Sequence, residues 1–168
     1  MATHIIEACA SIVRRNTSSL ISCLIALAAH QPASAADGLC EPLRAFAASV
    51  NPGETKVLKF HTIFGSNFKD RDQPGFGAKR CDPAGYEPAR AVCVYFMAYG
   101  DIQVPGHNAK LAVECLSKKT RFDVQVKVHA ISVSLKSGTE DRGSLMEIEL
   151  QENNELGGMV LTIAAKGY

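Results

Sequence analysis

Cysteine is the residue type with the most explicit chemistry in this sequence. Cys9 and Cys23 lie in an N-terminal stretch that has the features of an export signal. The remaining chain keeps four cysteines: Cys40, Cys81, Cys93 and Cys115. An even number in an exported chain predicts structural disulfides, whereas zinc favours closely spaced pairs of Cys or His ligands. The spacings of 41, 12 and 22 residues offer no such pair, so we predict two disulfides and no metal.

The pairing of these cysteines depends on a predicted helical hairpin, residues 87–100 and 107–117. In its first segment apolar residues recur at helical spacing: Ala89, Val92, Cys93, Phe96 and Tyr99. Pro88 suits the first turn of that helix, and Asn108 is suited to cap the second. The alternative for Val92–Tyr99 is a buried strand, because its composition also suits a sheet.

Within this hairpin Cys93 and Cys115 fall at nearly the same height. Cys93 precedes Gln103 in the turn by ten residues, and Cys115 follows it by twelve. Each helical residue rises by about 1.5 Å, so two antiparallel helices bring the two cysteines together. We therefore predict a Cys93–Cys115 disulfide and, by elimination, a Cys40–Cys81 disulfide.

Catalytic chemistry is sparse by comparison. A serine hydrolase requires an activated serine on a sharp turn, and no G-x-S-x-G motif occurs. A thiol enzyme requires a free cysteine, and all four remaining cysteines are predicted to form disulfides. Glu147 and Glu149 share the polar face of a predicted strand, but no opposing group completes an acid/base pair. Gly75 and Gly77 lack the strand-to-helix context of a nucleotide-binding loop, so we predict neither catalytic residues nor a cofactor.

Histidines are the basis of an alternative hypothesis, in which the protein is an enzyme. His61 and His129 fall on the polar phase of two predicted strands, and His107 is the third histidine after the export signal. If those strands were neighbours, His61 and His129 would meet a carboxylate such as Asp123 and form a metal-binding or hydrolytic site. A small secreted hydrolase or metal-dependent enzyme is therefore the alternative function.

The longest stretch without a predicted helix or strand is Gly65–Tyr86. Loops of such length in a compact domain are usually functional or disordered. Aromatic and charged residues give this one the composition of a recognition surface. We predict six binding residues in it: Phe68, Asp70, Arg71, Phe76, Lys79 and Arg80. In the alternative, both phenylalanines anchor the loop on the core while the charges face water.

Residues 1–35 predict a cleaved export signal. Arg14-Arg15 precedes the apolar run Leu20–Ala29, and Ala33-Ser34-Ala35 is an A-x-A cleavage site. A lipid anchor on Cys23 fits less well, because the apolar run mostly follows that cysteine. A twin-arginine signal also fits less well, because polar residues follow the arginine pair.

Residues 36–168 are expected to form a single periplasmic or secreted domain of balanced charge. Removing one Glu and two Arg from 17 acidic and 18 basic residues leaves 16 of each. Nucleic acids and anionic membranes select basic surfaces, so neither is a predicted partner. No further apolar segment approaches the length of a membrane span.

The predicted fold is α+β, with helices packed on a mainly antiparallel four-stranded sheet that has a C-terminal three-stranded meander. Outside the hairpin the expected elements are a helix at 39–50 and strands at 56–64, 122–136, 146–151 and 159–165. The alternation of apolar residues slips by one position near Ala130-Ile131, which predicts a β-bulge there.

A non-enzymatic binding protein fits these observations best. Export, two disulfides and the absence of a coherent catalytic set favour recognition of a protein or cell-envelope ligand through Gly65–Tyr86. An inhibitor or immunity-type periplasmic protein is one concrete form of this hypothesis.

Overall fold

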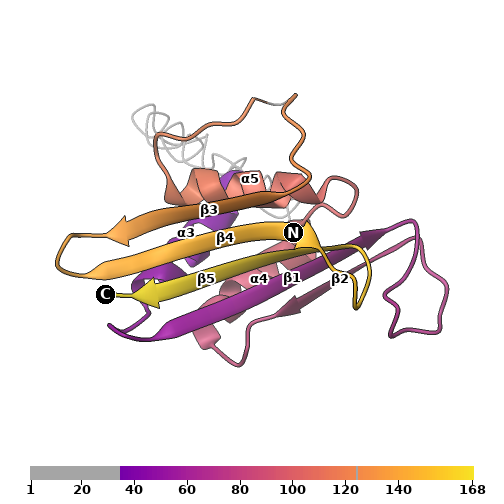
Figure 1. The fold of residues 1–168 in the computed structure, drawn as a ribbon, viewed down its shortest axis with the longest axis horizontal. Coiled ribbons are helices and arrows are strands. Elements are labelled where there is room, and N and C mark those ends of the chain that lie inside the picture. The colour runs from indigo at the N-terminus through magenta and orange to yellow at the C-terminus, as the bar shows by residue number, and fades with distance from the viewer. Residues whose placement is uncertain (1–34, 124) are drawn as a thin grey trace, which may run out of the picture. The chain divides into compact units, whose positions relative to one another are not determined.

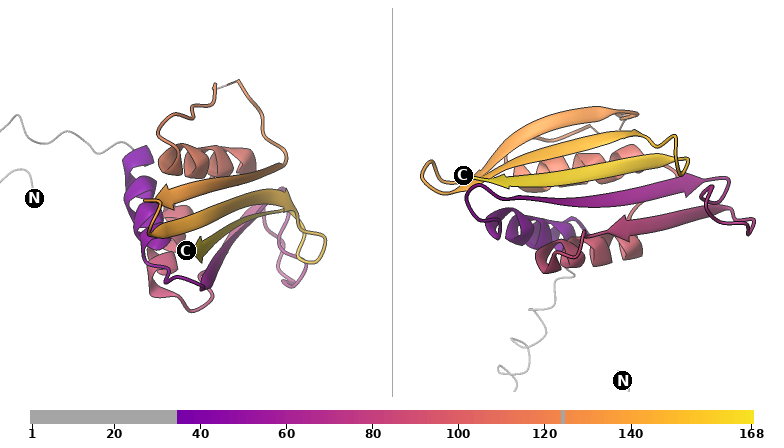
Figure 2. Two further views of the ribbon diagram at one scale, coloured as in Figure 1. Left: turned by 60° about the vertical axis from the view of Figure 1, so that its left-hand side comes forward. Right: turned by 60° about the horizontal axis from the view of Figure 1, so that its bottom comes forward.

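Three helices cover one face of a five-stranded sheet in the computed structural model, which describes residues 35–123 and 125–168 (Figures 1 and 2). The predicted export signal, apart from Ala35, lies outside the described residues. In chain order the elements are α3 (Ala35–Ala48), β1 (Thr55–Phe64), β2 (Gly77–Asp82), α4 (Glu87–Tyr99), α5 (Pro105–Leu116), β3 (Ile131–Gly138), β4 (Gly143–Glu152) and β5 (Met159–Gly167). The α+β class is therefore confirmed.

The sheet has the order β2-β1-β5-β4-β3, and every neighbouring pair is antiparallel. The strands β3, β4 and β5 form the C-terminal meander, but the prediction of four strands is wrong. The fifth strand, β2, lies inside the stretch Gly65–Tyr86 that was expected to be a loop. Its sequence, GAKRCD, lacks the apolar alternation by which half-buried strands are recognised, because β2 is a short strand at the edge of the sheet.

The hydrophobic core lies between the helices and the inner face of the sheet. Successive residues of a strand point to opposite faces. On β1 the inner residues Leu58 and Phe60 are 0–1% exposed, and Phe60 stacks on Phe96 of α4 with ring centroids 4.8 Å apart. On the outer face, which no helix covers, exposed polar side chains such as Lys59 and Glu149 alternate with these inner residues.

Both helices of the predicted hairpin are confirmed, but they pack little against each other, and the strand alternative for Val92–Tyr99 is excluded. Both helices have proline in the first turn, where a missing N–H costs no hydrogen bond. Asn108 does not cap α5 as expected, because α5 begins at Pro105. The buried amide of Asn108 instead donates to the Asp101 carbonyl and accepts from the Asp101 N–H, both at 2.8 Å, which fixes the turn between the helices.

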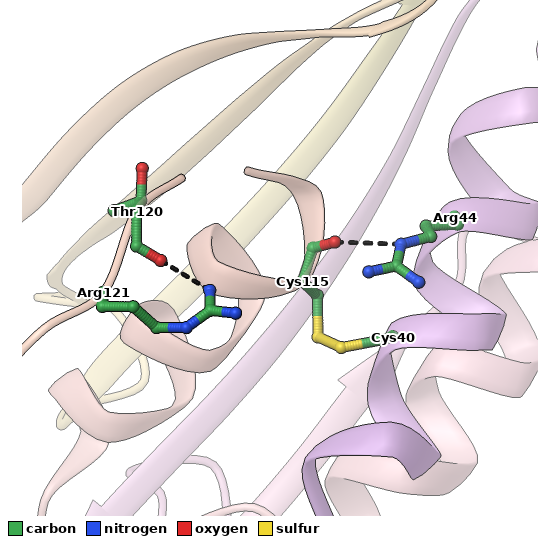
Figure 3. The surroundings of a disulfide bond; sticks show 5 residues. All are labelled: Cys40, Arg44, Cys115, Thr120 and Arg121. Carbon is green, nitrogen blue, oxygen red and sulfur yellow. Dashed lines mark hydrogen bonds between the residues drawn. A yellow bond between two sulfur atoms is a disulfide. The ribbon is translucent and has the colours of Figure 1, made fainter. Parts of the chain in front are cut away.

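The disulfides are Cys40–Cys115 and Cys81–Cys93, so the predicted pairing is wrong. The cause is α3, which begins at Ala35 instead of residue 39 and packs against both α4 and α5. Each of the helices α4 and α5 therefore packs more extensively against α3 than against its neighbour in the chain. Cys115 at the end of α5 reaches Cys40 on α3 (Figure 3). Cys93 on α4 is bonded to Cys81 on β2.

A hydrogen bond reinforces the first of these bridges. Arg44 lies one helical turn after Cys40, and its Nε donates to the carbonyl of Cys115 at 3.0 Å (Figure 3). Carbonyl groups in the last turn of a helix have no intrahelical partner, and a cation there also interacts favourably with the helix dipole. The α3 helix thus holds the end of α5 through a covalent bond and a hydrogen bond.

The segment before β3 is not the strand that its alternating sequence predicts. Residues 117–123 and 125–130 run beside α5. There Lys110 Nζ donates to the Val126 carbonyl at 3.0 Å, and Glu114 Oε1 accepts from the Phe122 N–H at 2.7 Å. The partly buried Phe122 and Val128 pack against the core next to that helix. The slip in the pattern near Ala130-Ile131 therefore marks the beginning of β3, and not a bulge within it.

The two disulfides indicate an oxidising, extracytoplasmic location. Among the described helices, none combines the length and the apolar character that crossing a bilayer requires.

Candidate functional site

The segment between β1 and β2, residues 65–76, folds back onto the outer face of the sheet, and we call it the 65–76 loop. Its ends are joined because the Gly65 N–H donates to the Phe76 carbonyl at 2.9 Å. Within it, Asn67 Nδ2 donates to the Gln73 carbonyl at 2.8 Å. The loop is therefore closed at its neck and cross-linked internally.

A buried aromatic residue attaches this loop to the sheet. Phe68 is 1% exposed, and its ring meets the edge of the His61 ring at a centroid distance of 6.5 Å. The guanidinium of Arg80 lies 4.9 Å from the centre of the Phe68 ring, within the range of a cation–π contact. His61 on β1 and Arg80 on β2 are register partners, so the two strands together form the seat for Phe68.

An ion pair closes the same cluster from the loop side. Arg80 Nη1 and Nη2 donate to the two carboxylate oxygens of Asp70 at 2.8 and 3.0 Å. These hydrogen bonds lower the pKa of Asp70 and raise the pKa of Arg80. The paired, planar geometry orients the guanidinium over Phe68 even though both charged groups are open to water.

The turn between β4 and β5 supplies a third attachment. The Lys69 N–H donates to the Leu156 carbonyl and Lys69 Nζ donates to the Asn154 carbonyl, both at 2.9 Å. Three independent contacts, through Phe68, Asp70 and Lys69, thus fix the position of the 65–76 loop.

His61 is the buried titratable group of this site, at 7% exposure. Asn153 Oδ1 accepts from the N–H groups of Glu155 and Leu156 at 3.0 and 2.9 Å, which directs Asn153 Nδ2 toward His61. That amide nitrogen lies 3.3 Å from His61 Nδ1, and a donor at this position requires an unprotonated Nδ1. Burial, followed by the nearby charges of Arg80 and Lys59, lowers the pKa of His61 below 6.5.

The lowered pKa of His61 predicts that the protein loses stability in mild acid. A histidine whose pKa is lower in the folded chain binds more protons when unfolded, so its contribution to stability is complete above pH 6.5 and is lost as the pH falls through the folded pKa. His61→Gln removes the titration and keeps an acceptor for Asn153. The difference between unfolding free energies at neutral and mildly acidic pH should therefore shrink in this variant.

Urea unfolding at a series of pH values measures this effect, with His129→Gln at an exposed position as the matched control. An unchanged pH dependence in His61→Gln would contradict the assigned role of His61.

The structure joins some of the predicted binding residues and separates others. Phe68, Asp70 and Arg80 form the cluster described above, so Phe68 is the packed anchor of the alternative interpretation. Phe76 is 94% exposed, as a recognition residue would be. Arg71 is also exposed, whereas Lys79 points to the opposite face of β2, where its Nζ donates to the Met97 carbonyl at 3.4 Å.

Two residues of the site were not among those predicted. Phe64, 58% exposed, ends β1 at the neck of the loop, and the sequence marked it only as the last residue of a strand. Asn153 lies between the predicted strands 146–151 and 159–165, and its contact with His61 joins segments 92 residues apart. No local pattern carries that information.

The alternative site of His61, His129 and Asp123 is not assembled. The strands β1 and β3 are separated by β5 and β4, and His129 precedes β3. Asp123 lies in the segment beside α5, where its carbonyl is 3.5 Å from Lys110 Nζ. In residues 35–123 and 125–168, no three His, Cys, Asp or Glu side chains are grouped as metal ligands.

Two shallow hollows border the 65–76 loop. One, of about 460 Å³, is lined by the loop itself, from Gly65 to Gly75. The other, of about 280 Å³, lies between Lys69 and the β4–β5 turn. Both are open and lined by polar and apolar groups in similar measure, unlike the enclosed apolar pockets that bury small molecules.

Comparison of the chain with protein-family models, with curated proteins and with solved structures gave no match. Function therefore has to be inferred from the geometry and chemistry of the described residues.

Proposed function

We propose that this protein is an exported, non-enzymatic binding protein that recognises a protein or cell-envelope ligand through the neck of the 65–76 loop. The observation that supports this most is Phe76, which is 94% exposed on a segment held by Phe68, the Asp70–Arg80 ion pair and the hydrogen bonds of Lys69. Exposed aromatic residues are the usual energetic centres of protein interfaces.

Rigidity of the loop adds to this support. Binding costs free energy when a flexible segment must be ordered, so a loop that is already fixed can bind with less loss. The closed neck, where Gly65 donates to Phe76, places Phe76 and the exposed Phe64 at one end of the sheet. We infer that the partner buries Phe76 and contacts the exposed Arg71 at the rim.

Placement of the protein outside the cytoplasm belongs to the same proposal. Two disulfides and the signal-like N-terminal sequence favour the periplasm or the exterior. An inhibitor or immunity-type protein that occupies another exported protein is the concrete form that we favour, because such a role requires a rigid surface and no catalytic group.

Truncation of Phe76 should weaken partner binding strongly and leave folding almost unchanged. We expect Phe76→Ala to reduce the free energy of binding by about 2 kcal/mol or more, the size of an interface hot spot. The measurement is capture from an envelope extract by the purified wild-type protein, followed by titration of the captured partner. Val126→Ala, at another exposed apolar residue, is the matched control. Equal binding by wild type and Phe76→Ala would contradict the proposal.

A further inference from the structure

The strand β2 ends the sheet and has one unpaired main-chain edge. In an antiparallel pair, hydrogen-bonded positions alternate along each strand. The Gly65 N–H donates to the Phe76 carbonyl, so in the same register Ala78, Arg80 and Asp82 direct their main-chain groups toward β1. The N–H and carbonyl groups of Gly77, Lys79 and Cys81 therefore point away from the sheet.

The helix beside this edge leaves an apolar surface uncovered. Cys93 of α4 faces β2, as its disulfide with Cys81 requires. Met97 follows Cys93 by one helical turn, and Val94 lies farther round the same side at about 100° per residue. Met97 is 46% exposed and Val94 is 65% exposed. The sheet ends at β2, so no strand covers these side chains.

The other edge of the sheet, formed by β3, also has an unpaired main chain, but the helix beside it is covered. Beside β3, the segments 117–123 and 125–130 cover the adjacent helix α5. They accept a hydrogen bond from Lys110, donate one to Glu114, and contain the partly buried Phe122 and Val128. Only at β2, among the described residues, do a free main-chain edge and an uncovered apolar helix face coincide.

The positive charge of Lys79 is a third feature of the β2 edge. Arg80 pairs with Asp70, and Arg90 on α4 pairs with Glu87. Lys79 faces the α4 side, and no carboxylate in residues 35–123 and 125–168 forms a salt bridge with it. A partner that supplied an acidic side chain at this position would complement Lys79.

We propose that β2 accepts an extended strand of a partner protein, which adds to the sheet as a sixth strand. Its main chain would bond to Gly77, Lys79 and Cys81, its inward side chains would cover Val94 and Met97, and an acidic residue among them would pair with Lys79. This inference rests on the proposed function and specifies the partner segment that is recognised. That segment is extended, has alternating apolar residues and carries one carboxylate. Phe76 directly precedes β2, so the strand continues the same recognition surface.

The test uses linear peptides of about six to ten residues, the usual length of a strand, displayed on phage as a random library. Peptides selected on the purified, oxidised protein should share apolar residues at alternate positions and an acidic residue among them. The outward amide protons of Gly77, Lys79 and Cys81 should exchange more slowly when such a peptide binds.

Two substitutions at one position isolate the main-chain contact. Lys79→Ala removes the charge and keeps the outward N–H, whereas Lys79→Pro removes the N–H as well. We expect the dissociation constant of the selected peptides to be about tenfold higher in Lys79→Pro than in Lys79→Ala, as the loss of one main-chain hydrogen bond predicts. Val94→Asp, on the exposed helix face, tests the apolar contact without touching the strand, with Val126→Asp as its control.

The outcomes separate this inference from the proposed function. Failure to select any peptide, or equal binding by Lys79→Pro and Lys79→Ala together with full binding by Val94→Asp, would overturn the sixth strand. Self-association that Lys79→Pro abolishes would also overturn it, because a second copy would then occupy the edge. If the edge variants fail to affect binding while Phe76→Ala still weakens capture of the partner, recognition through the 65–76 loop is supported and addition of a sixth strand is rejected.

Discussion

Replacing Phe68 with alanine is expected to lower the free energy of unfolding by about 3–5 kcal/mol, as truncation of a buried phenylalanine does. Phe68 lies in a loop, yet it is 1% exposed between the His61 ring and the Arg80 guanidinium. The substitution leaves a cavity on the outer face of the sheet and removes the main attachment of the 65–76 loop. Urea unfolding followed by circular dichroism measures the loss.

Phe76→Ala is the matched control for this experiment. Phe76 is 94% exposed in the same loop, and exposed substitutions usually change stability by no more than about 0.5 kcal/mol. A large loss in both variants would mean that Phe76 is packed in solution, which would end the hypothesis of a recognition residue. A negligible loss in Phe68→Ala would mean that the loop is not held by this side chain.

Removal of the Cys40–Cys115 disulfide has the second large expected effect. This bridge spans 75 residues, and the chain-entropy estimate for such a loop is about 4 kcal/mol of stability. The Cys81–Cys93 bridge spans 12 residues, for which the same estimate is about 3 kcal/mol. Cys40→Ala with Cys115→Ala should therefore destabilise the fold more than Cys81→Ala with Cys93→Ala.

Peptide mapping of the non-reduced protein checks the connectivity on which this prediction depends. Digestion should yield one peptide pair containing Cys40 and Cys115 and another containing Cys81 and Cys93. A Cys93–Cys115 pair would contradict the arrangement of α3 against α4 and α5. A larger loss of stability on removal of the shorter bridge would contradict the predicted order of the two effects.

Local patterns in the sequence predicted the elements that bury a regular apolar stripe. The helix spacing from Ala89 to Tyr99 and the alternation in β1, β4 and β5 each correspond to an inner face in the structure. These elements are recognisable because burial on one side imposes a period on the sequence. The helices α4 and α5 and the antiparallel meander followed from that period.

Features that depend on tertiary contacts were not predictable in the same way. The short edge strand β2 buries little, so its sequence carries no clear alternation. Phe122 and Val128 are partly buried against the core although their segment is not a strand, and Val126, in the same phase, is exposed. The alternation there does not correspond to one face of a sheet. Cysteine pairing was inferred from two helices, whereas the position of a third, α3, decided it.

The candidate site was also predictable from local sequence only in part. The composition of residues 65–86 predicted a recognition surface, and three of the predicted binding residues, Asp70, Arg80 and Phe68, do lie together. Composition could not distinguish the packed Phe68 from the exposed Phe76. That distinction depends on His61 and Arg80 forming a seat on the sheet, which only the register of β1 with β2 provides.

Site-specific photo-crosslinking from position 76 tests the recognition surface most directly. A photoreactive phenylalanine analogue replaces Phe76 in the exported protein, and the same analogue at Val126 serves as the control because both positions are exposed. Irradiation of whole cells should give a discrete adduct with one envelope or exported protein from position 76 and none from position 126. The absence of any adduct at position 76, or the same adducts at both positions, would contradict recognition through the 65–76 loop.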